Sequence, residues 1–466
     1  MPFIRSISGL RGTIGDGLTP DLIVRYVAAF TEYAGTGIIV VGRDGRPSGS
    51  WIEEIVVGTV RACGSAARVI GVAPTPTVQL ATEKSEAVGG ISITASHNPS
   101  EWNGLKFLNS DGIFLSPEDC VRFFAIADRL EPRSYAGWRE IGSRVDAEGD
   151  LNRHIELALA LPFVTVDGLQ GRAFKVVVDA VNASGSVIVP RLLERCGCEV
   201  IPLFCDGSGS FPHTPEPLPE NLTLLSDAVI AGGADLGIAV DPDADRLVLI
   251  DENGVPFGEE YTITQAADFI LRWERGRDAD AELLAVVNLS TTRAVEDVAA
   301  KYGARVLRTP VGEINVARKM KESGAVIGGE GSGGVILPSL HYGRDSLAGI
   351  IITLQHLLEH GGTLSSLRAD LPSYEIVKRR ADLAPGTDTA AMLKLIESEA
   401  GDNARITTDD GLKIDFERSW VHLRASNTEP IIRVIAEAAA RAEAEELADR
   451  FLAKLRMMTE HPATMR

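Results

Sequence analysis

The chain has 466 residues, 45% of them hydrophobic and 24% charged, a globular composition that is long enough for about three domains of ~150 residues with room for a smaller fourth. Its 65 Asp and Glu against 46 Lys and Arg give a net charge of −19, which repels a polyanion, so we expect no nucleic-acid partner. The five cysteines form no Cys-x-x-Cys pair, the start MPFIRSISGLRGTIG lacks the apolar core of a signal peptide, and no apolar run approaches ~20 residues, so we expect a cytoplasmic protein without a membrane segment.

Short runs rich in Val and Ile alternate with segments of helical periodicity over the first three quarters of the chain. This alternation is typical of parallel sheets with crossover helices, and it occurs three times. In the first unit we expect strands at residues 37–44, 67–74 and 89–94 and a helix at 50–64. The second unit has expected strands at 174–181, 198–204 and 234–240 with a helix at 184–197. The third has expected strands at 283–290, 304–312 and 324–328, a helix at 291–303 and a second helix ending at Ser323.

The pattern changes towards the C-terminus. Residues 405–417 alternate around an Asp410-Gly411 turn, a further alternating stretch follows at 419–438, and a charged helix is expected at 441–458. The predicted fold class is therefore α/β, with three similar mixed or parallel α/β domains and a C-terminal α+β domain. We place these domains at residues 1–155, 156–256, 257–370 and 371–466.

Polar residues follow the strand at 89–94 in the sequence TASHNPSEWNGLK, residues 94–106, which we call the serine loop. Ligands of open α/β sheets gather at the carboxyl ends of strands, so Ser96, His97 and Lys106 are candidate site residues. A loop serine is more often a turn residue than a nucleophile. The loop also lacks the G-x-S-x-G elbow of hydrolases, which disfavours acyl transfer.

The sequence DPDADR, residues 241–246, follows a second predicted strand, and we call it the acidic loop. An extended backbone would point Asp241, Asp243 and Asp245 to one side. Three adjacent carboxylates repel one another unless a cation lies among them, and oxygen ligands suit Mg²⁺ or Ca²⁺. An EF-hand is disfavoured because Arg246 stands where that loop needs glycine. The alternative is a solvated acidic turn.

The sequence GGEGSGG, residues 328–334, is the glycine loop. It matches neither the P-loop nor G-x-G-x-x-G, which disfavours nucleotide binding. The carboxylate of Glu330 and the hydroxyl of Ser332 could form hydrogen bonds to sugar hydroxyls, because the glycines around them carry no side chains that would block a sugar. The alternative is a plain flexible turn.

The sequence RASNTEP, residues 424–430, is the arginine loop, and Arg433 follows it. Guanidinium, hydroxyl and amide groups such as those of Arg424, Ser426 and Thr428 are the groups that bind a phosphate dianion. An Asn-rich turn, containing Asn427 and capped by an arginine, is the alternative interpretation of the same residues.

The four loops fit one reaction, the movement of a phosphoryl group between Ser96 and a phosphorylated sugar, because phosphoryl transfer needs mainly positioning and charge neutralisation. The motifs TASHNP, DPDADR, GEGSGG and RASNTEP, with SGLRG at residues 8–12, also occur in the order found in the α-D-phosphohexomutase superfamily, which the chain strongly resembles. The resemblance spans residues 8–433 and implies four domains around a central cleft.

The resemblance also implies roles for the residues of these loops. Ser96 would carry the phosphoryl group and, with Asp241, Asp243 and Asp245, would complete a Mg²⁺ site. A sugar 1,6-bisphosphate would be the intermediate and the activator. Lys106 and His97 would give acid/base help, and Arg11 and Arg246 would offset charge. The residues expected to bind substrate are Thr309, Gly312, Glu330, Ser332, Arg424, Ser426, Asn427, Thr428 and Arg433.

The choice of sugar is a finer inference. The sugar loops of many phosphomannomutases and phosphoglucomutases resemble Gly-Glu-x-Ser-Gly-His, whereas Gly334 stands in the last place here. Either His341 replaces that imidazole or the site works without one. GEGSGG, with TPVGE at 309–313, looks most like the branch usually assigned as phosphoglucosamine mutase, which implies conversion of glucosamine 6-phosphate to glucosamine 1-phosphate. A phosphomannomutase/phosphoglucomutase with the same mechanism is the alternative.

Two other classes fit less well. A metal-dependent phosphatase with an Asp nucleophile is disfavoured because Pro242 separates the first two acids and a separate serine loop is present. A non-catalytic sugar-phosphate binder would be expected to have lost Ser96, Lys106 or one of the acids. The expected partner is a hexose or aminosugar phosphate, and the sequence leaves the oligomeric state open, a homodimer included.

Overall fold

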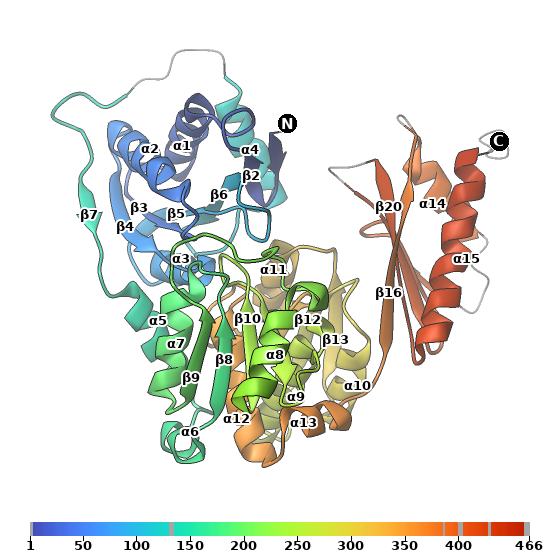
Figure 1. Ribbon diagram of the computed structural model, residues 1–466. Helices are drawn as coiled ribbons and strands as arrows, with labels where there is room; N and C mark the ends of the chain where they lie inside the picture. The colour runs from blue at the N-terminus through green and yellow to red at the C-terminus, as the bar shows by residue number, and fades with distance from the viewer. Residues whose placement is uncertain (1–2, 130–134, 385–386, 399–403, 427–429, 461–466) are drawn as a thin grey trace.

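The computed structural model describes residues 3–129, 135–384, 387–398, 404–426 and 430–460. Four sheets follow one another along the chain, and we call the parts built on them domains I to IV (Figure 1). This order confirms the predicted three α/β domains followed by an α+β domain, while the expected boundaries near residues 155, 256 and 370 stay predictions. None of the helices in these residues is long and apolar enough to cross a membrane.

Domain I has a seven-stranded sheet in the order β1-β2-β6-β5-β3-β4-β7. Its strands are β1 (Ile4–Ser6), β2 (Gly9–Thr13), β3 (Ile38–Arg43), β4 (Ala66–Val72), β5 (Ala87–Ile93), β6 (Trp102–Asn109) and β7 (Arg144–Asp146). Its helices are α1 (Pro20–Ala34), α2 (Gly49–Ala62), α3 (Thr75–Glu83) and α4 (Pro117–Ala127). Helix α4 begins at a capping box between Ser116 and Asp119, with Pro117 at its first position.

Domains II and III each have a four-stranded sheet. Domain II contains α5 (Asp150–Leu159), α6 (Val166–Arg172), β8 (Lys175–Asp179), α7 (Gly185–Arg195), β9 (Glu199–Phe204), η1 (Pro219–Asn221), α8 (Thr223–Gly232), β10 (Leu236–Val240) and β11 (Leu247–Asp251). Domain III contains α9 (Glu259–Arg277), β12 (Leu284–Asn288), α10 (Ala294–Lys301), β13 (Arg305–Thr309), α11 (Glu313–Ser323), β14 (Ile327–Glu330), β15 (Gly334–Ile336), α12 (Ser346–His360) and α13 (Leu364–Asp370).

One four-stranded arrangement occurs in all three α/β domains. Its strand order is β6-β5-β3-β4 in domain I, β11-β10-β8-β9 in domain II and β15-β14-β12-β13 in domain III. In each unit three strands are parallel to one another, and the strand that comes last in the sequence is antiparallel to its neighbour. The serine, acidic and glycine loops all connect the third strand of this unit to that antiparallel fourth strand. The three loops therefore leave equivalent ends of three similar sheets.

Domain IV has a five-stranded antiparallel sheet in the order β16-β20-β19-β18-β17. Its elements are β16 (Glu375–Asp382), α14 (Thr389–Ser398), β17 (Arg405–Thr407), β18 (Leu412–Asp415), β19 (Trp420–Ala425), β20 (Ile431–Ala438) and α15 (Arg441–Glu460). Figure 1 shows this domain set apart from the other three, to which it is joined through the segment between α13 and β16.

The buried apolar residues show which domains share a core. One cluster runs from Ile155 to Leu371 and joins domains II and III, and another combines residues of domain I, such as Val40 and Leu108, with residues of domain III, such as Val286. The cluster of domain IV contains only residues between 377 and 458. Domains I to III thus pack as one body through shared apolar clusters.

Candidate functional site

A cavity of about 1020 Å³ lies where the four domains meet, and each domain contributes to its wall. This finding confirms the predicted central cleft. The wall contains nine of the predicted site residues, namely Arg11, His97, Lys106, Gly312, Arg246, Glu330, Ser332, Arg424 and Arg433. Ser96 and the three acids of the acidic loop are almost fully buried beside it.

The serine loop is held from inside by Arg46, which the sequence analysis did not single out. Arg46 is fully buried, and its Nε donates to Asp44 at 2.9 Å. Its other N–H groups donate to the carbonyls of Ser96 (2.6 Å), Asn98 (2.7 Å), Pro99 (2.7 Å) and Trp102 (3.1 Å). A guanidinium has five N–H donors, so four of them fix this loop and the fifth binds Asp44.

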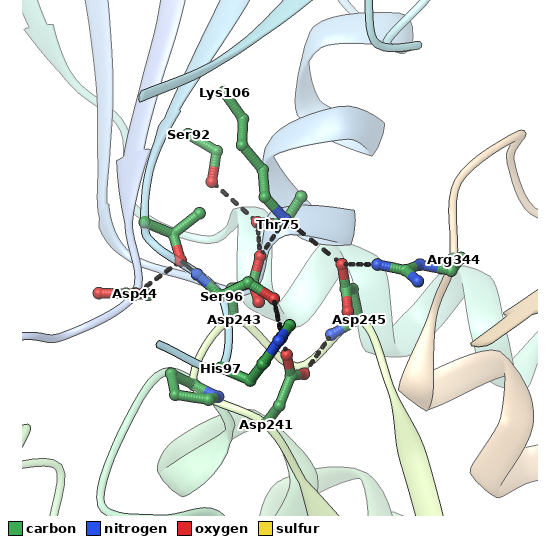
Figure 2. A network of polar contacts seen from close by, with 12 residues as sticks. Asp44, Thr75, Ser92, Ser96, His97, Lys106, Asp241, Asp243, Asp245 and Arg344 are labelled. Carbon is green, nitrogen blue, oxygen red and sulfur yellow. Dashed lines mark hydrogen bonds and ion pairs between the residues drawn. The ribbon is translucent and has the colours of Figure 1, made fainter. Parts of the chain in front are cut away.

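Ser96 has a backbone conformation that L-residues rarely adopt, with φ at 51°. The Thr94 hydroxyl accepts a hydrogen bond from the Ser96 amide at 2.8 Å and donates to Asp44 at 2.6 Å. The Ser96 Oγ then lies 3.2 Å from Asp241 Oδ2 and 3.3 Å from His97 Nδ1. The strained backbone therefore directs the hydroxyl towards the acidic loop (Figure 2).

The acidic loop brings its three carboxylates together, but not through an extended backbone, and that part of the prediction is wrong. Residues 242–244 form a turn, in which Ala244 has φ at 49°. The turn is stabilised by Asp241 Oδ1, which accepts from the amides of Asp245 at 3.1 Å and Arg246 at 3.2 Å. One ligand atom from each acid lies within 4.8 Å of the others, and all three side chains are buried.

Two cations partly neutralise these carboxylates. Lys106 Nζ lies 2.6 Å from Asp243 Oδ2 and 3.3 Å from Asp245 Oδ2, and Arg344 donates to Asp245 Oδ2 at 2.6 Å (Figure 2). Burial alone would raise the pKa of Asp243, but Lys106 outweighs it and holds that pKa below its usual value. At Asp241, burial with the charges of Asp245 and Asp243 raises the pKa well above the usual value, and the charge of Arg246 opposes only part of this effect.

The donor set fits a divalent cation. Asp243 Oδ1 and Asp245 Oδ1 are buried and have no hydrogen-bond partner among the described residues. An unpartnered buried carboxylate oxygen is costly, and an ion such as Mg²⁺ takes oxygen ligands of this kind. Lys106 and Arg344 contact Asp243 and Asp245, and Arg344 is shared with Glu313 and Glu330, so a bound metal would add positive charge that these contacts do not supply.

The cavity side of the serine loop is strongly basic. Arg11 donates to Asn98 at 3.2 Å, and Arg246 lies 3.8 Å from Glu216. Burial, and then the charges of Arg246 and Arg11, lower the pKa of His97 to about 2. His97 is therefore neutral here and a weak base.

The glycine loop is held by contacts that reach across domain III. Glu330 Oε1 accepts from Asn288 at 2.8 Å and from the Gly312 amide at 2.9 Å, and Glu330 Oε2 accepts from Arg344 at 2.8 Å. Asn288 and Arg344 also line the cavity. His341 does not, among the residues described, because it is buried and hydrogen-bonded to Asp345 at 3.1 Å.

The remaining predicted residues that the structure describes make contacts within their own domains. Arg424 Nε donates to Asp410 at 2.9 Å, and the Ser426 amide donates to the Ile431 carbonyl at 2.9 Å, while Asn427 and Thr428 lie outside the described residues. Thr309 is buried, its hydroxyl donates to the Pro310 carbonyl at 3.0 Å, and it is absent from the cavity wall as far as the described chain shows.

Sequence reasoning missed several residues that build the cavity, above all Arg46, Arg344, Glu313, Glu260 and Asn288. Asn288 had a usable signal, because it is a polar residue at the carboxyl end of a predicted strand. Glu313 stands in the quoted TPVGE stretch. Arg46, Arg344 and Glu260 lie outside the motifs, and only the tertiary structure brings them to the site.

Comparison with known proteins agrees with this geometry along the whole chain. Four consecutive stretches match phosphoglucomutase/phosphomannomutase domains: alpha/beta/alpha domain I at residues 4–132, domain II at 152–254, domain III at 261–374 and the C-terminal domain at 377–454. The chain belongs to this family. It is thus a phosphohexomutase of the α-D-phosphohexomutase superfamily, as the motifs indicated.

Similar proteins cover nearly the full length of this phosphohexomutase. A probable phosphoglucosamine mutase from Methanopyrus kandleri is 39% identical, over 97% of this chain and 98% of its own. A phosphoglucomutase/phosphomannomutase from Thermococcus kodakarensis is 37% identical, over 94% and 95%. A solved structure of a phosphoglucomutase/phosphomannomutase family protein from Burkholderia thailandensis has a TM-score of 0.82 at 26% identity and covers 97% of this chain and 98% of its own.

Proposed function

We propose that this phosphohexomutase interconverts glucosamine 6-phosphate and glucosamine 1-phosphate through a phosphoserine at Ser96 and a 1,6-bisphosphate intermediate. The phosphoryl group would pass from Ser96 Oγ to the free hydroxyl of the sugar phosphate. After the bisphosphate turns around, its other phosphoryl group would return to Ser96, so no phosphate is consumed. The placement of Ser96 Oγ 3.2 Å from Asp241, in a buried pocket beside the cavity, supports this role.

The acidic loop supports a Mg²⁺ site next to that serine. Asp241, Asp243 and Asp245 would hold the ion with one phosphoryl oxygen, and the ion would neutralise charge on the transferring group. Lys106 is already bound to two of these acids, and their charges raise its pKa although burial opposes this. Lys106 is therefore suited to balancing charge rather than to releasing a proton.

The neutral His97 is the better candidate for the proton of the attacking sugar hydroxyl. It lies beside Ser96 Oγ and lines the cavity. The negative charge of a phosphoserine would raise its pKa and so make it a stronger base. Arg11 and Arg246 face the same part of the cavity and would attract the phosphoryl oxygens.

The other walls suit the rest of the substrate. Glu330 would accept hydrogen bonds from sugar hydroxyls and Ser332 would donate to them, with Gly312, whose amide donates to Glu330, on the same wall. Thr309 lies in the same segment as Gly312 and would act by supporting it. Arg424, Ser426, Asn427, Thr428 and Arg433 would bind the phosphate that is not reacting. Binding energy from this remote phosphate would align the reactive end.

One observation carries the choice of an aminosugar. Glu260 lines the cavity directly beside the glycine loop, since a Cβ on Gly331 would lie 1.8 Å from Glu260 Oε2. Glu260 Oε2 accepts from the Thr292 amide at 2.9 Å, whereas Oε1 has no hydrogen-bond partner among the described residues. Its neighbour Lys378 is paired with Glu259 at 2.5 Å. Burial raises the pKa of Glu260 well above its usual value although the charge of Lys378 opposes this. An ammonium group on the sugar would add a second cation beside this carboxylate and favour its charged form.

The test compares glucosamine 6-phosphate, glucose 6-phosphate and mannose 6-phosphate as substrates in the presence of Mg²⁺ and a priming bisphosphate. We expect kcat/KM to favour the aminosugar at least tenfold, and Glu260→Gln to remove most of that preference without changing turnover of glucose 6-phosphate. Preference for glucose or mannose would instead identify a phosphomannomutase/phosphoglucomutase, which is the name of the Thermococcus kodakarensis relative.

A further inference from the structure

Arg344 is the meeting point of three parts of the cavity. Its Nη2 donates to Asp245 of the acidic loop at 2.6 Å, and its Nη1 donates to Glu330 of the glycine loop at 2.8 Å. Its Nε donates to Glu313 at 3.1 Å, and its backbone amide donates to the other oxygen of Glu313 at 3.1 Å. Glu313 is the first residue of α11, next to Gly312 on the cavity wall. One guanidinium thus binds three carboxylates from three segments of the chain.

Arg344 reaches these partners across Gly334, the last residue of the glycine loop. A Cβ on Gly334 would lie 2.3 Å from Arg344 Cδ, 3.1 Å from Cγ and 3.4 Å from Nε. Real Cβ atoms do not come this close, so any side chain at position 334 would displace the arginine. The head group cannot move aside easily, because all three of its nitrogens are already bonded to carboxylates. The absence of a side chain at 334 is therefore a condition for the observed position of Arg344.

We propose that Arg344 is a positioning residue that holds both Asp245 and Glu330 in their working positions. The absence of a side chain at Gly334 leaves the room that Arg344 needs to reach them. A single planar cation with fixed N–H directions sets the distance between the two carboxylates, which a lysine could not do. The acidic loop and the glycine loop are then ordered as one unit. Disturbing Arg344 should therefore affect phosphoryl transfer and sugar binding at the same time.

This inference rests on the roles proposed above for Asp245 and Glu330, but not on the identity of the sugar. The two can fail separately. If Asp245→Asn and Glu330→Gln both turn over as fast as the unaltered protein, the proposed roles are wrong. The position of Arg344 is tested instead by its coupling to Gly334.

The experiment is a double-mutant cycle on the full chain, with the sugar phosphate that it converts fastest. Gly334→Ala is expected to lower kcat at least tenfold and to raise KM at least threefold, because the added methyl group displaces Arg344. Arg344→Ala is expected to lower kcat/KM at least a hundredfold. The double variant should lie within twofold of Arg344→Ala alone, since no arginine remains to be displaced.

Two further variants make the cycle decisive. Gly58→Ala adds a methyl group at an exposed position of α2 with nothing within 4 Å, and it should leave kcat and KM unchanged. Arg344→Lys keeps the charge and replaces Arg344→Ala if that variant does not fold; it should lose at least tenfold in kcat/KM and should likewise mask Gly334→Ala. Additive effects in the cycle, or a lower kcat with KM unchanged in Gly334→Ala, would overturn the proposal.

Discussion

Domains I to III and domain IV are attached to the cavity in different ways. The first three share apolar cores, so that Val40 of domain I and Val286 of domain III belong to the same buried cluster. Domain IV has a cluster of its own, between residues 377 and 458. Buried apolar contacts resist relative motion, whereas small polar interfaces between domains allow it. The residues around Ser96 thus lie on one packed body, and the arginine loop lies on another.

Several contacts between domains III and IV are polar. Ser290 Oγ lies 2.9 Å from His422 Nδ1, the Val311 amide donates to Asp410 at 2.9 Å, and the Arg293 amide donates to Glu437 at 3.0 Å. Asp410 is also the residue that holds Arg424. In the proposed function the chemistry lies on the packed body and binding of the remote phosphate lies on the separately attached one. The following predictions test that division from the largest expected effect to the smallest.

Ser96→Ala should have the largest effect, because it removes the atom proposed to carry the phosphoryl group from the packed body. We expect turnover to fall at least a thousandfold, ~4 kcal/mol in the transition state, with little change in thermal stability. Mass spectrometry should find phosphoserine at position 96 only in the unaltered protein. Ser100→Ala, at an exposed position of the same loop, is the control. Full turnover by Ser96→Ala would exclude a phosphoserine mechanism.

Asp243→Asn should have the next largest effect. The change removes the closest partner of Lys106 and one of three oxygen donors, so we expect kcat to fall about a hundredfold and the Mg²⁺ concentration for half-maximal rate to rise. Removing metal with EDTA should stop turnover in the unaltered protein, and added Mg²⁺ should restore it. Asp280→Asn, at an exposed position, should behave as the unaltered protein. An unchanged Mg²⁺ dependence in Asp243→Asn would argue against the acidic loop as the metal site.

Arg424→Ala probes the other side of the comparison, on domain IV. Loss of a charge-assisted bond to the non-reacting phosphate should raise KM about tenfold, and kcat should fall less because the packed body is intact. Arg418→Ala, exposed on the same domain, should change neither constant. If kcat fell as strongly as in Asp243→Asn with KM unchanged, Arg424 would belong to the chemical step instead.

The smallest expected effect is a change of shape. Since the described residues of domain IV form an apolar cluster of their own, we predict that this domain closes on substrate. Small-angle scattering of Ser96→Ala, which binds but should not turn over, is expected to show a radius of gyration a few per cent smaller with sugar phosphate than without, and inorganic sulfate at equal ionic strength is the control. Identical profiles would mean that the two bodies keep their relative position.

The sequence was sufficient to predict most strands and the four loops, for physical reasons. Runs such as residues 37–44 and 234–240 are largely apolar and lie inside their sheets: β3 is parallel to both neighbours, and β10 is parallel to β8 and antiparallel to β11. Strand β6 was not predicted because it contains Gly104 and Lys106, which interrupt the apolar pattern. Lys106 is buried at the site rather than exposed to solvent.

The site was predicted wherever its residues are grouped in the sequence, as in the acidic and glycine loops. It was not predicted where a single residue acts at long range. Arg46 donates to carbonyls about fifty residues away, and Arg344 binds Asp245 from a different part of the chain. No local pattern marks such residues. The turn at Ala244 was missed because three alternating acids suit a strand as well as a turn.

The backbone conformation at Ser96 has a consequence for how this protein would evolve or be engineered. Glycine adopts φ near 51° without strain, whereas serine does so at a cost of order 1 kcal/mol. A screen that selects only for resistance to heat should therefore enrich Ser96→Gly, a variant that is more stable and inactive. Selection for the reaction and selection for stability thus oppose each other at this one position, so serine would persist here only while the reaction itself is under selection.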